Sequence, residues 1–331
     1  MSNIDLLSVG DASLDVFVDP SESEALCRMD DKECLICFSY GDKIPVRHLE
    51  FSVGGNAANN SVGTRRLGIS SAAVLTLGSD DIGNQIKKKL ENEGVNTSFI
   101  IQQPSTTSNY STVVNYSGER TIFSYKAPRS YEFPVKLPKA SWLYLTSMGE
   151  SFRPFYNHVI SWMRLNPETK LAFNPGSRQL RAGVDAIRDV IKISHIIYIN
   201  RKEAEMITGQ ENSRGKEKDL LNALVQMGVK KPIVTDGANG SFVFDGEKYL
   251  NCGILPIDAH ERTGAGDAFG SGCITALIQG KPFEEALLWG TVNSASVIGY
   301  TGSQKGLLKQ EEIDTWLQRA KSCNVKVEEI K

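Results

Sequence analysis

The stretch HERTGAGDAFGSG, at residues 260–272, places four glycines within nine positions at the start of an apolar segment that predicts a helix. A glycine in a helix interior costs about 1 kcal/mol relative to alanine. A bound phosphate explains this cost, because glycines let the backbone turn sharply and let an anion approach without meeting a Cβ atom. Helix N-termini also attract anions through their free amides and positive dipole end. The stretch therefore predicts a phosphate cradle built from the amides of Gly264, Ala265 and Gly266.

Asp267 follows this cradle, in the first turn of the predicted helix. A carboxylate there suits the helix dipole but repels a bound phosphate. The conflict is resolved if Asp267 takes a proton from a hydroxyl group that attacks the phosphorus atom. Taken by itself, the loop is equally compatible with an ordinary helix start whose small residues allow tight packing.

Short apolar segments alternate with helical segments along most of the chain. The apolar pattern predicts strands at residues 4–10, 72–78, 141–147, 170–175, 195–200 and 231–237. A helix is predicted at residues 80–94, capped by Asp80 and ended by Gly94, and others begin near Arg153, Gln179 and Gly215. This alternation predicts an α/β fold, with a doubly wound, mostly parallel sheet as a Rossmann-like core. Ligands bind beyond the carboxyl ends of the strands in such sheets.

Two segments break this rhythm. Residues 16–50 show little periodicity, and residues 109–126 alternate as two strands around a turn at Ser117-Gly118. Both are expected to stand off the α/β core and to form a small β-rich lid. The alternative is a pair of surface excursions without a role. No repeat or low-complexity linker divides the chain, so we expect a single domain over residues 1–331 that includes the lid.

A second glycine motif, GGNAANNSVGTRRLG at residues 54–68, precedes a small-residue helix that carries several asparagines. Asn56 stands at the position of a helix cap, whereas Asn59 lies too far into the helix for that role. Asp15 follows the first strand, at another carboxyl end. An aspartate that accepts hydrogen bonds, an asparagine that donates and accepts, and a glycine amide together suit adjacent sugar hydroxyls.

With these motifs the sequence resembles the ribokinase-like (PfkB) family of carbohydrate and nucleoside kinases. The likeness runs from VGDASLD at residues 9–15 to GSQKGLL at residues 302–308, and its most specific parts are the two glycine motifs. The resemblance implies a ribokinase-like fold and an ATP-dependent kinase that uses Mg²⁺. Such a kinase transfers the γ-phosphoryl group to a hydroxymethyl of a sugar or sugar-like substrate. It also implies Asp267 as general base and Gly264 to Gly266 as an anion hole.

The resemblance carries further roles onto matching positions. It implies substrate-hydroxyl contacts at Asp15, Gly55 and Asn59, and nucleotide contacts at Asn200, Thr235, Gly237, Gly240 and Asn293. Glu203, in NRKEAEMITG, matches an Asn-x-x-Glu element that helps place magnesium indirectly. An exposed first-turn acid remains the alternative for Glu203, and a polar residue in a small-residue helix remains the alternative for Asn293.

Several positions depart from the family pattern. Glu261-Arg262-Thr263 replaces the common Asp-Thr-Thr, so binding of a monovalent cation stays open. Arg262 is expected either to reach a nucleotide phosphate or to pair with Glu261. The motif GGNAAN lacks the Gly-Lys pair typical of ribokinase, which weakens the case for ribose. On the predicted lid, Arg120 and Tyr125 are either substrate contacts or exposed strand residues. A sugar acceptor is favoured over a nucleoside.

Composition bounds the partners and the setting. The net charge of −2 gives no basic stripe for nucleic acid or an anionic membrane surface. No apolar run reaches 18 residues, and the N-terminus does not resemble a signal peptide. Six scattered cysteines favour a reducing, cytoplasmic setting. The expected partners are a small-molecule sugar or nucleoside and, through the lid, a second copy in a homodimer.

One cysteine group has a second interpretation. Cys27, Cys34 and Cys37, with His48, could offer zinc a tetrahedral site. Their irregular spacing favours lid cysteines without a metal.

Three other functions share features with this sequence. A nucleoside kinase of the same family and a sugar- or nucleotide-binding protein without catalysis both stay open, although the intact motif at Gly264–Asp267 disfavours the latter. A dinucleotide-dependent dehydrogenase is disfavoured because no G-x-G-x-x-G follows the first strand. The sequence also has no Walker A motif, so it is not a P-loop kinase.

Overall fold

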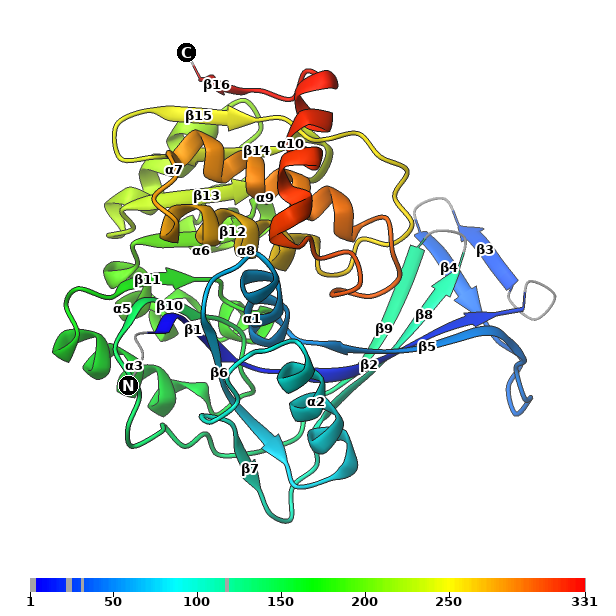
Figure 1. Cartoon of the computed structure of the whole chain (residues 1–331). Helices are drawn as coiled ribbons and strands as arrows, with labels where there is room; N and C mark the ends of the chain where they lie inside the picture. Colours follow the sequence, from blue (N-terminus) through cyan, green and yellow to red (C-terminus); the bar gives the residue numbers. More distant parts are fainter. Residues whose placement is uncertain (1–3, 22–25, 31–32, 117–118, 331) are drawn as a thin grey trace.

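The fold consists of a large sheet covered by helices and a small sheet that stands off its side (Figure 1). The computed structural model describes residues 4–21, 26–30, 33–116 and 119–330, with residues 26–30, 33, 34 and 119 described by their backbone. The predicted α/β architecture with a doubly wound, mostly parallel sheet is confirmed.

The large sheet has ten strands. In spatial order they are β16 (Val327–Glu329), β15 (Tyr249–Cys252), β14 (Ser241–Phe244), β13 (Lys231–Thr235), β12 (Ile196–Asn200), β11 (Lys170–Phe173), β10 (Ala140–Leu145), β1 (Ile4–Gly10), β6 (Ser71–Gly78) and β7 (Ile101–Gln103). The strands from β13 to β7 pair in parallel, and β14 to β16 extend the sheet antiparallel. All six strands predicted from the sequence lie in the parallel part.

Helices cover both faces of this sheet because successive strand residues point to opposite faces. Leu7 and Val9 of β1 pack in one core with α3, α5, α6 and α7, whereas Leu6 packs in the other with α8, α9 and α10. The helices are α1 (Asn56–Arg66), α2 (Asp81–Asn92), α3 (Phe152–Leu165), α4 (Ser177–Arg181), α5 (Arg188–Ile193), α6 (Arg201–Thr208), α7 (Glu217–Gln226), α8 (Ala265–Ile278), α9 (Phe283–Val297) and α10 (Ile313–Ser322). Short 3-10 turns are η2 (Val184–Ala186), η3 (Gly237–Asn239) and η4 (Gln310–Glu312).

The predicted helix starts are confirmed. The Asp80 carboxylate accepts a hydrogen bond from the Gly83 amide at 2.8 Å and so caps α2. This bond satisfies one of the amides that a helix N-terminus leaves unpaired. Helices α3, α4 and α7 begin within two residues of the other three predicted starts.

The small sheet is the expected β-rich lid, in the order β5 (Val46–Gly54), β2 (Ser13–Pro20), β8 (Asn109–Tyr116) and β9 (Glu119–Tyr125). The predicted hairpin at 109–126 corresponds to antiparallel β8 and β9, and its turn at Ser117-Gly118 lies outside the described residues. Residues 16–50 contain more strand than their pattern predicted. Strand β2 pairs with β5 and with the distant β8, and these pairings define its extent. Strands β3 (Leu26–Asp30) and β4 (Glu33–Cys37) form a separate antiparallel pair.

The strand order defines where a ligand binds. Strand β1 lies between β6 and β10, so the chain crosses to opposite sides of β1 at this point. Such a reversal opens a crevice beyond the carboxyl ends of parallel strands. Asp11, Ser147 and Asn174 follow the ends of β1, β10 and β11 at this edge.

Candidate active site

The centre of the site is the carboxylate of Asp267, in the first turn of α8. Asp267 is 8% exposed. The side-chain amides of Asn56 and Asn59, both on α1, each donate a hydrogen bond to one of its oxygens at 2.8 Å. The two glycine motifs of the sequence therefore meet at one carboxylate.

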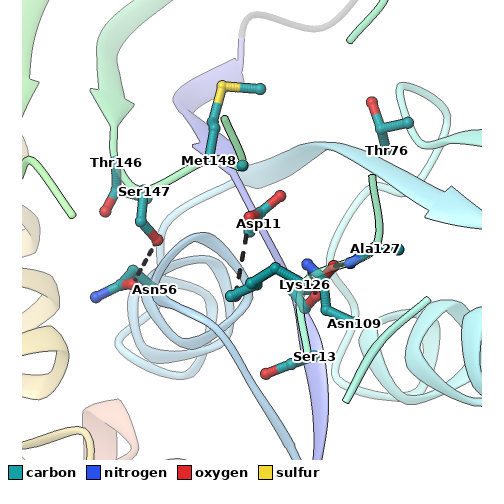
Figure 2. A network of polar contacts seen from close by, with 12 residues as sticks. Asp11, Ser13, Asn56, Thr76, Asn109, Lys126, Ala127, Thr146, Ser147 and Met148 are labelled. Carbon is teal, nitrogen blue, oxygen red and sulfur yellow. Dashed lines mark hydrogen bonds and ion pairs between the residues drawn. The ribbon is translucent and has the colours of Figure 1, made fainter. Parts of the chain in front are cut away.

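The two asparagines are themselves held in place. The Asn56 side-chain oxygen accepts a hydrogen bond from the Ser147 hydroxyl at 2.7 Å (Figure 2). The Asn59 oxygen accepts from the Ser303 hydroxyl at 2.9 Å and from the Gln304 amide at 3.1 Å. The interpretation of Asn56 as a helix cap is wrong, because Gly55 is the N-cap of α1 and the Asn56 side chain contacts Asp267 instead.

Two opposing effects set the protonation of Asp267. Burial raises the pKa of its carboxyl group above the ordinary value, and the hydrogen bonds from Asn59 and Asn56 lower it. Burial is the larger effect, so the pKa is raised. A carboxylate in this state is a stronger base than one in water, which suits proton abstraction near neutral pH.

The backbone before Asp267 forms the start of α8. Gly264 is the N-cap in the left-handed conformation, with φ of 81°, and a Cβ atom there would lie 2.4 Å from the Ser303 Cβ. Only glycine fits this position. A Cβ atom on Gly266 would meet nothing within 4 Å, so the backbone of the first turn faces open space. The geometry fits an anion at this helix N-terminus.

A pocket opens in front of this turn. It is lined by Asn56, Asn174, Tyr198, Ile199, Asn200, Glu203, Thr235, Arg262, Gly264, Ala265, Gly266, Asp267 and Phe269. Asn200 and Glu203 form a capping box at the start of α6, in which each side chain accepts from the other's backbone amide, at 3.0 and 2.9 Å. Burial raises the pKa of Glu203. Of the residues expected from the resemblance, this pocket joins Asn200, Glu203 and Thr235 to the α8 turn.

The side chains that line this pocket can bind magnesium only together with the phosphates of a nucleotide. Among the described residues, no group of three or more His, Cys, Asp or Glu side chains is arranged to hold a metal. Magnesium in nucleotide sites usually keeps several waters and is bound by one or two carboxylates plus the substrate's phosphates. Glu203 lines the pocket and can supply one carboxylate directly or through water. The residues therefore fit a magnesium ion that arrives with a nucleotide.

Three expected nucleotide residues lie apart from the pocket lining. Gly237 and Gly240 belong to the turn around η3, directly after β13. Asn293 is fully buried in α9, where its amide donates to the Ala268 carbonyl at 2.8 Å and its oxygen accepts from the Leu308 amide at 2.9 Å. These two bonds join α8, α9 and the segment that follows α9.

Asp15 lies on β2 of the lid and is 8% exposed. Burial raises the pKa of its carboxyl group, and hydrogen bonds from the hydroxyls of Ser13, at 2.9 Å, and Ser111 lower it. Gly54 and Gly55 connect the lid strand β5 to α1. This connection brings Asp15 and Gly55 to the same edge of the sheet as Asp267.

Asp11 was not among the site residues predicted from the sequence. Its carboxylate accepts a hydrogen bond from the Tyr131 hydroxyl at 3.1 Å. The same carboxylate lies 3.8 Å from the Lys126 ammonium group (Figure 2). Burial raises the pKa of Asp11 and the Lys126 charge lowers it. The sequence did contain an indication of Asp11, because an acidic residue directly follows the first predicted strand, at its carboxyl end. Asn174 was missed in the same way at the end of β11.

The sequence left open whether Arg262 pairs with Glu261 or faces the nucleotide, and the structure favours the second. Glu261 pairs with Arg120 of the lid, at 3.6 Å, while Arg262 lines the pocket. Tyr125 is half exposed, and its hydroxyl lies 3.3 Å from that of Thr107.

Two of the four residues in the zinc hypothesis, Cys37 and His48, have described side chains. The side chains of Cys27 and Cys34 lie outside the described part of the chain. Cys37 is an exposed free thiol, and the His48 ring lies 3.5 Å from the Glu50 carboxylate.

A doubly wound sheet, a helix N-terminus that faces a pocket and a buried carboxylate beside it define a phosphotransferase with an alcohol group as acceptor. The chain belongs to the pfkB family of carbohydrate kinases, whose model matches residues 26–310. A ribokinase of Haemophilus influenzae is 25% identical over 294 residues, which cover 85% of this chain and 92% of that protein. An ATP-dependent 6-phosphofructokinase of Thermoanaerobacterium thermosaccharolyticum is 26% identical over 295 residues, covering 85% and 88%.

Solved structures confirm the ribokinase-like fold. A ribokinase of Arabidopsis thaliana, complexed with ribose and ATP, superposes with a TM-score of 0.77 at 20% identity, over 96% of this chain and 99% of that one. An aminoimidazole riboside kinase of Salmonella enterica gives a TM-score of 0.72 at 20% identity, over 95% and 99%. In the described residues no helix is long and apolar enough to cross a membrane.

Proposed function

We propose that this protein is an ATP-dependent kinase that phosphorylates a hydroxymethyl group of a sugar or sugar-like acceptor. Asp267 takes the proton of the acceptor hydroxyl while the hydroxyl oxygen forms a bond to the γ-phosphorus. The bond from that phosphorus to the β–γ bridging oxygen breaks, and ADP leaves. The amides of Gly264, Ala265 and Gly266 bind the oxygens of the phosphoryl group in flight.

One observation carries this proposal. Asp267 is buried, its pKa is raised, and it lies in the same helical turn whose backbone faces the pocket. A structural acid in a helix start is ordinarily exposed and has no need of two asparagine donors from another helix. A base that must hold one orientation beside an anion hole needs both the burial and the donors.

On the donor side, Asn200, Thr235, Gly237, Gly240 and Asn293 are proposed to bind or position the nucleotide. Thr235 and Asn200 line the pocket and are the direct candidates. Asn293 would not contact the nucleotide but would hold α8 in position through its hydrogen bond to the Ala268 carbonyl. Magnesium would neutralise phosphate charge when bound, with Glu203 holding it indirectly.

On the acceptor side, Asp15, Gly55 and Asn59 are proposed to hold sugar hydroxyls. Asn59 uses one of its two N–H groups on Asp267, which leaves the other for a substrate. A riboside is a second candidate acceptor, because the aminoimidazole riboside kinase shares the fold over nearly the whole chain.

Turnover across a panel of acceptors tests the proposal. Purified protein with ATP and Mg²⁺ is offered pentoses, hexoses, ketoacid sugars and nucleosides, and both ADP and the phosphorylated product are measured. We expect one sugar to be phosphorylated with the highest kcat/KM, and Asp267→Asn serves as the matched control. Fastest turnover of a nucleoside would favour the second candidate. Tight binding of sugar and ATP without any product would indicate a binding protein that lacks catalysis.

The lid is also proposed to pair with a second copy of the chain, within a single-domain protein of the cytoplasm. Leu49, Phe51, Phe123 and Tyr125 share the face of the lid sheet opposite Asp15, and each is at least 50% exposed. Burying such a patch favours association. Sedimentation should give a dimer for the wild type and a monomer for Phe51→Asp. A monomeric wild type would contradict the pairing.

A further inference from the structure

The carboxylate of Glu261 lies where the lid meets the phosphate-binding turn. Its side chain is 6% exposed. One oxygen accepts a hydrogen bond from the Thr263 amide at 2.8 Å, and the other accepts from the Gly302 amide at 3.1 Å. Glu261 therefore ties together two loops, the one that leads into Gly264 and the one that follows α9.

The cation that pairs with this buried carboxylate belongs to the lid. The Arg120 guanidinium, on β9, lies 3.6 Å from the Glu261 carboxylate. A buried charge that loses its partner is strongly unfavourable, because water cannot replace the missing cation. The energy of Glu261 thus depends on the position of the lid.

The lid also packs directly on the second loop. Gly302 has φ of 84°, and a Cβ atom there would lie 2.9 Å from the Ser52 hydroxyl on β5 and 3.7 Å from the Phe17 ring on β2. Three of the four lid strands therefore touch Glu261 or the glycine bonded to it. Displacing the lid would remove a charge pair and a packed contact together.

The loop at residues 302–305 contacts the lid at one end and, through Asn59, supports the Asp267 carboxylate. Ser303 and Gln304 directly follow Gly302 and hold the Asn59 side-chain oxygen, at 2.9 and 3.1 Å. Asn59 in turn donates to Asp267 at 2.8 Å. The Ser303 Cβ also fills the space that only a glycine at position 264 leaves free. One loop thus supports both the base and the cradle.

We propose that Glu261 is a positioning residue that makes the geometry of Asp267 and the Gly264 turn depend on the lid, through its pair with Arg120 and its bond to Gly302. The inference rests on the proposed kinase function and adds to it a coupling between lid position and chemistry. With Arg120 in contact, Glu261 fixes both loops. When the lid moves away, the unpaired carboxylate loosens them and the site loses its productive geometry. Such a device suppresses phosphoryl transfer to water while the acceptor site is open.

The test compares Arg120→Gln, which removes the lid cation, with Arg120→Lys, which keeps the charge. Arg188→Gln is the control, because Arg188, at the start of α5, makes an exposed pair with Asp185, at 2.6 Å. Turnover is measured with ATP, Mg²⁺ and ribose, fructose or adenosine as acceptor probes. Hydrogen exchange of the Thr263 and Gly302 amides is measured on the same proteins without ligand.

For Arg120→Gln we expect kcat to fall about 10- to 100-fold, the size that a misplacement of about 1 Å costs, with KM for ATP nearly unchanged. Both amides should exchange about tenfold faster or more. Arg120→Lys should recover most of kcat, and free guanidinium ion should partly restore Arg120→Gln where equal sodium chloride does not. Arg188→Gln should match the wild type.

Two results would overturn the coupling. One is unchanged exchange at Thr263 and Gly302 in Arg120→Gln, which is decisive even if no probe is phosphorylated. The other is a kcat within about twofold of the wild type in that variant. Absence of acceptor-dependent turnover in the wild type would count against the proposed function alone, since the exchange measurement does not depend on it. Unchanged exchange in the central sheet verifies that each variant is folded.

Discussion

Asn59 donates a hydrogen bond to Asp267 across 208 positions of sequence, at 2.8 Å. The bond joins the first turns of two helices, α1 and α8, which follow Gly54-Gly55 and Gly264 respectively. Both helix starts contribute positive dipole ends and donors to the same small volume. At their meeting point the pKa of a single carboxyl group is raised by burial and lowered by hydrogen bonds from two side-chain amides, with burial the larger effect. This combination is what a proton acceptor next to a phosphate requires.

The first prediction concerns this carboxylate. Asp267→Asn should lower turnover roughly 10²- to 10⁴-fold, the usual contribution of a general base, with the fold and ATP binding kept. The change keeps the shape of the side chain and removes its charge. Steady-state turnover and nucleotide titration check it. Retention of more than about a tenth of wild-type turnover, with chemistry rate-limiting, would show that Asp267 is not the base.

The second prediction concerns pH. Since the base acts ionised, kcat/KM should fall as the pH drops through the pKa of Asp267, which burial raises above its ordinary value. Asn56 donates to the ionised form and lowers that pKa, so Asn56→Ala should raise it and move the acidic limb to higher pH. Thr235→Ala is the control, as it changes a pocket residue that the Asp267 pKa does not depend on. A limb that stays in place or moves to lower pH in Asn56→Ala would contradict the assignment.

The sequence predicted the parallel core and the two glycine motifs well, and the physical reason is local. Strands such as β6 and β12 are buried on both faces and end at turn residues, so short apolar runs identify them. The left-handed helix start, where we propose a phosphate cradle, is likewise encoded within the few residues around Gly264. The start of α2 was predictable because Asp80 caps the helix with its own side chain, a contact between neighbours in sequence.

What local patterns could not supply were contacts between distant segments. Asn56 looked like a helix cap because its role depends on Asp267, 211 positions away. The extent of β2 was missed because it depends on pairing with β8, where Ser13 lies opposite Asn109. Asp11 and Asn174 were visible as polar residues at strand ends, but only the strand order brings those ends together.

The third prediction separates the two substrates. Asp15→Ala should weaken acceptor binding by about 1 to 3 kcal/mol, because sugar hydroxyls lose a buried acceptor, while ATP binding stays nearly unchanged. Thr235→Ala should instead weaken ATP binding and leave acceptor binding nearly unchanged. Titration calorimetry with acceptor and with ATP measures both. Equal losses for the two ligands in Asp15→Ala would argue against a substrate role.

The fourth prediction concerns stability. Glu93 accepts two hydrogen bonds from Arg66, both at 2.8 Å, and these lower its pKa from the ordinary 4.5 to about 2. A lowered pKa in the folded state stabilises the protein above the unfolded-state value, and this contribution is lost as the pH falls from about 4.5 to about 2. Glu93→Gln should therefore be less stable at pH 7, by on the order of 2 kcal/mol. The difference in unfolding free energy should shrink over that window. A constant difference from pH 7 to pH 2 would rule out the charge as its cause.

The last prediction concerns the lid as a cover for the acceptor. Phosphoryl transfer to a sugar must exclude water, which would otherwise accept the phosphate. The lid sheet stands off the main core, so it should be among the least stable parts of the free protein. Acceptor binding should slow hydrogen exchange in β2, β5, β8 and β9 and change little in the central sheet. Replacing the tip of the β8–β9 hairpin with a shorter turn that keeps Arg120, and with it the Glu261 pair, should raise ATP hydrolysis relative to sugar phosphorylation, because water then reaches the phosphoryl group. If acceptor binding leaves lid exchange unchanged and the shortened protein keeps its ratio of phosphorylation to hydrolysis, the small sheet does not act as a cover.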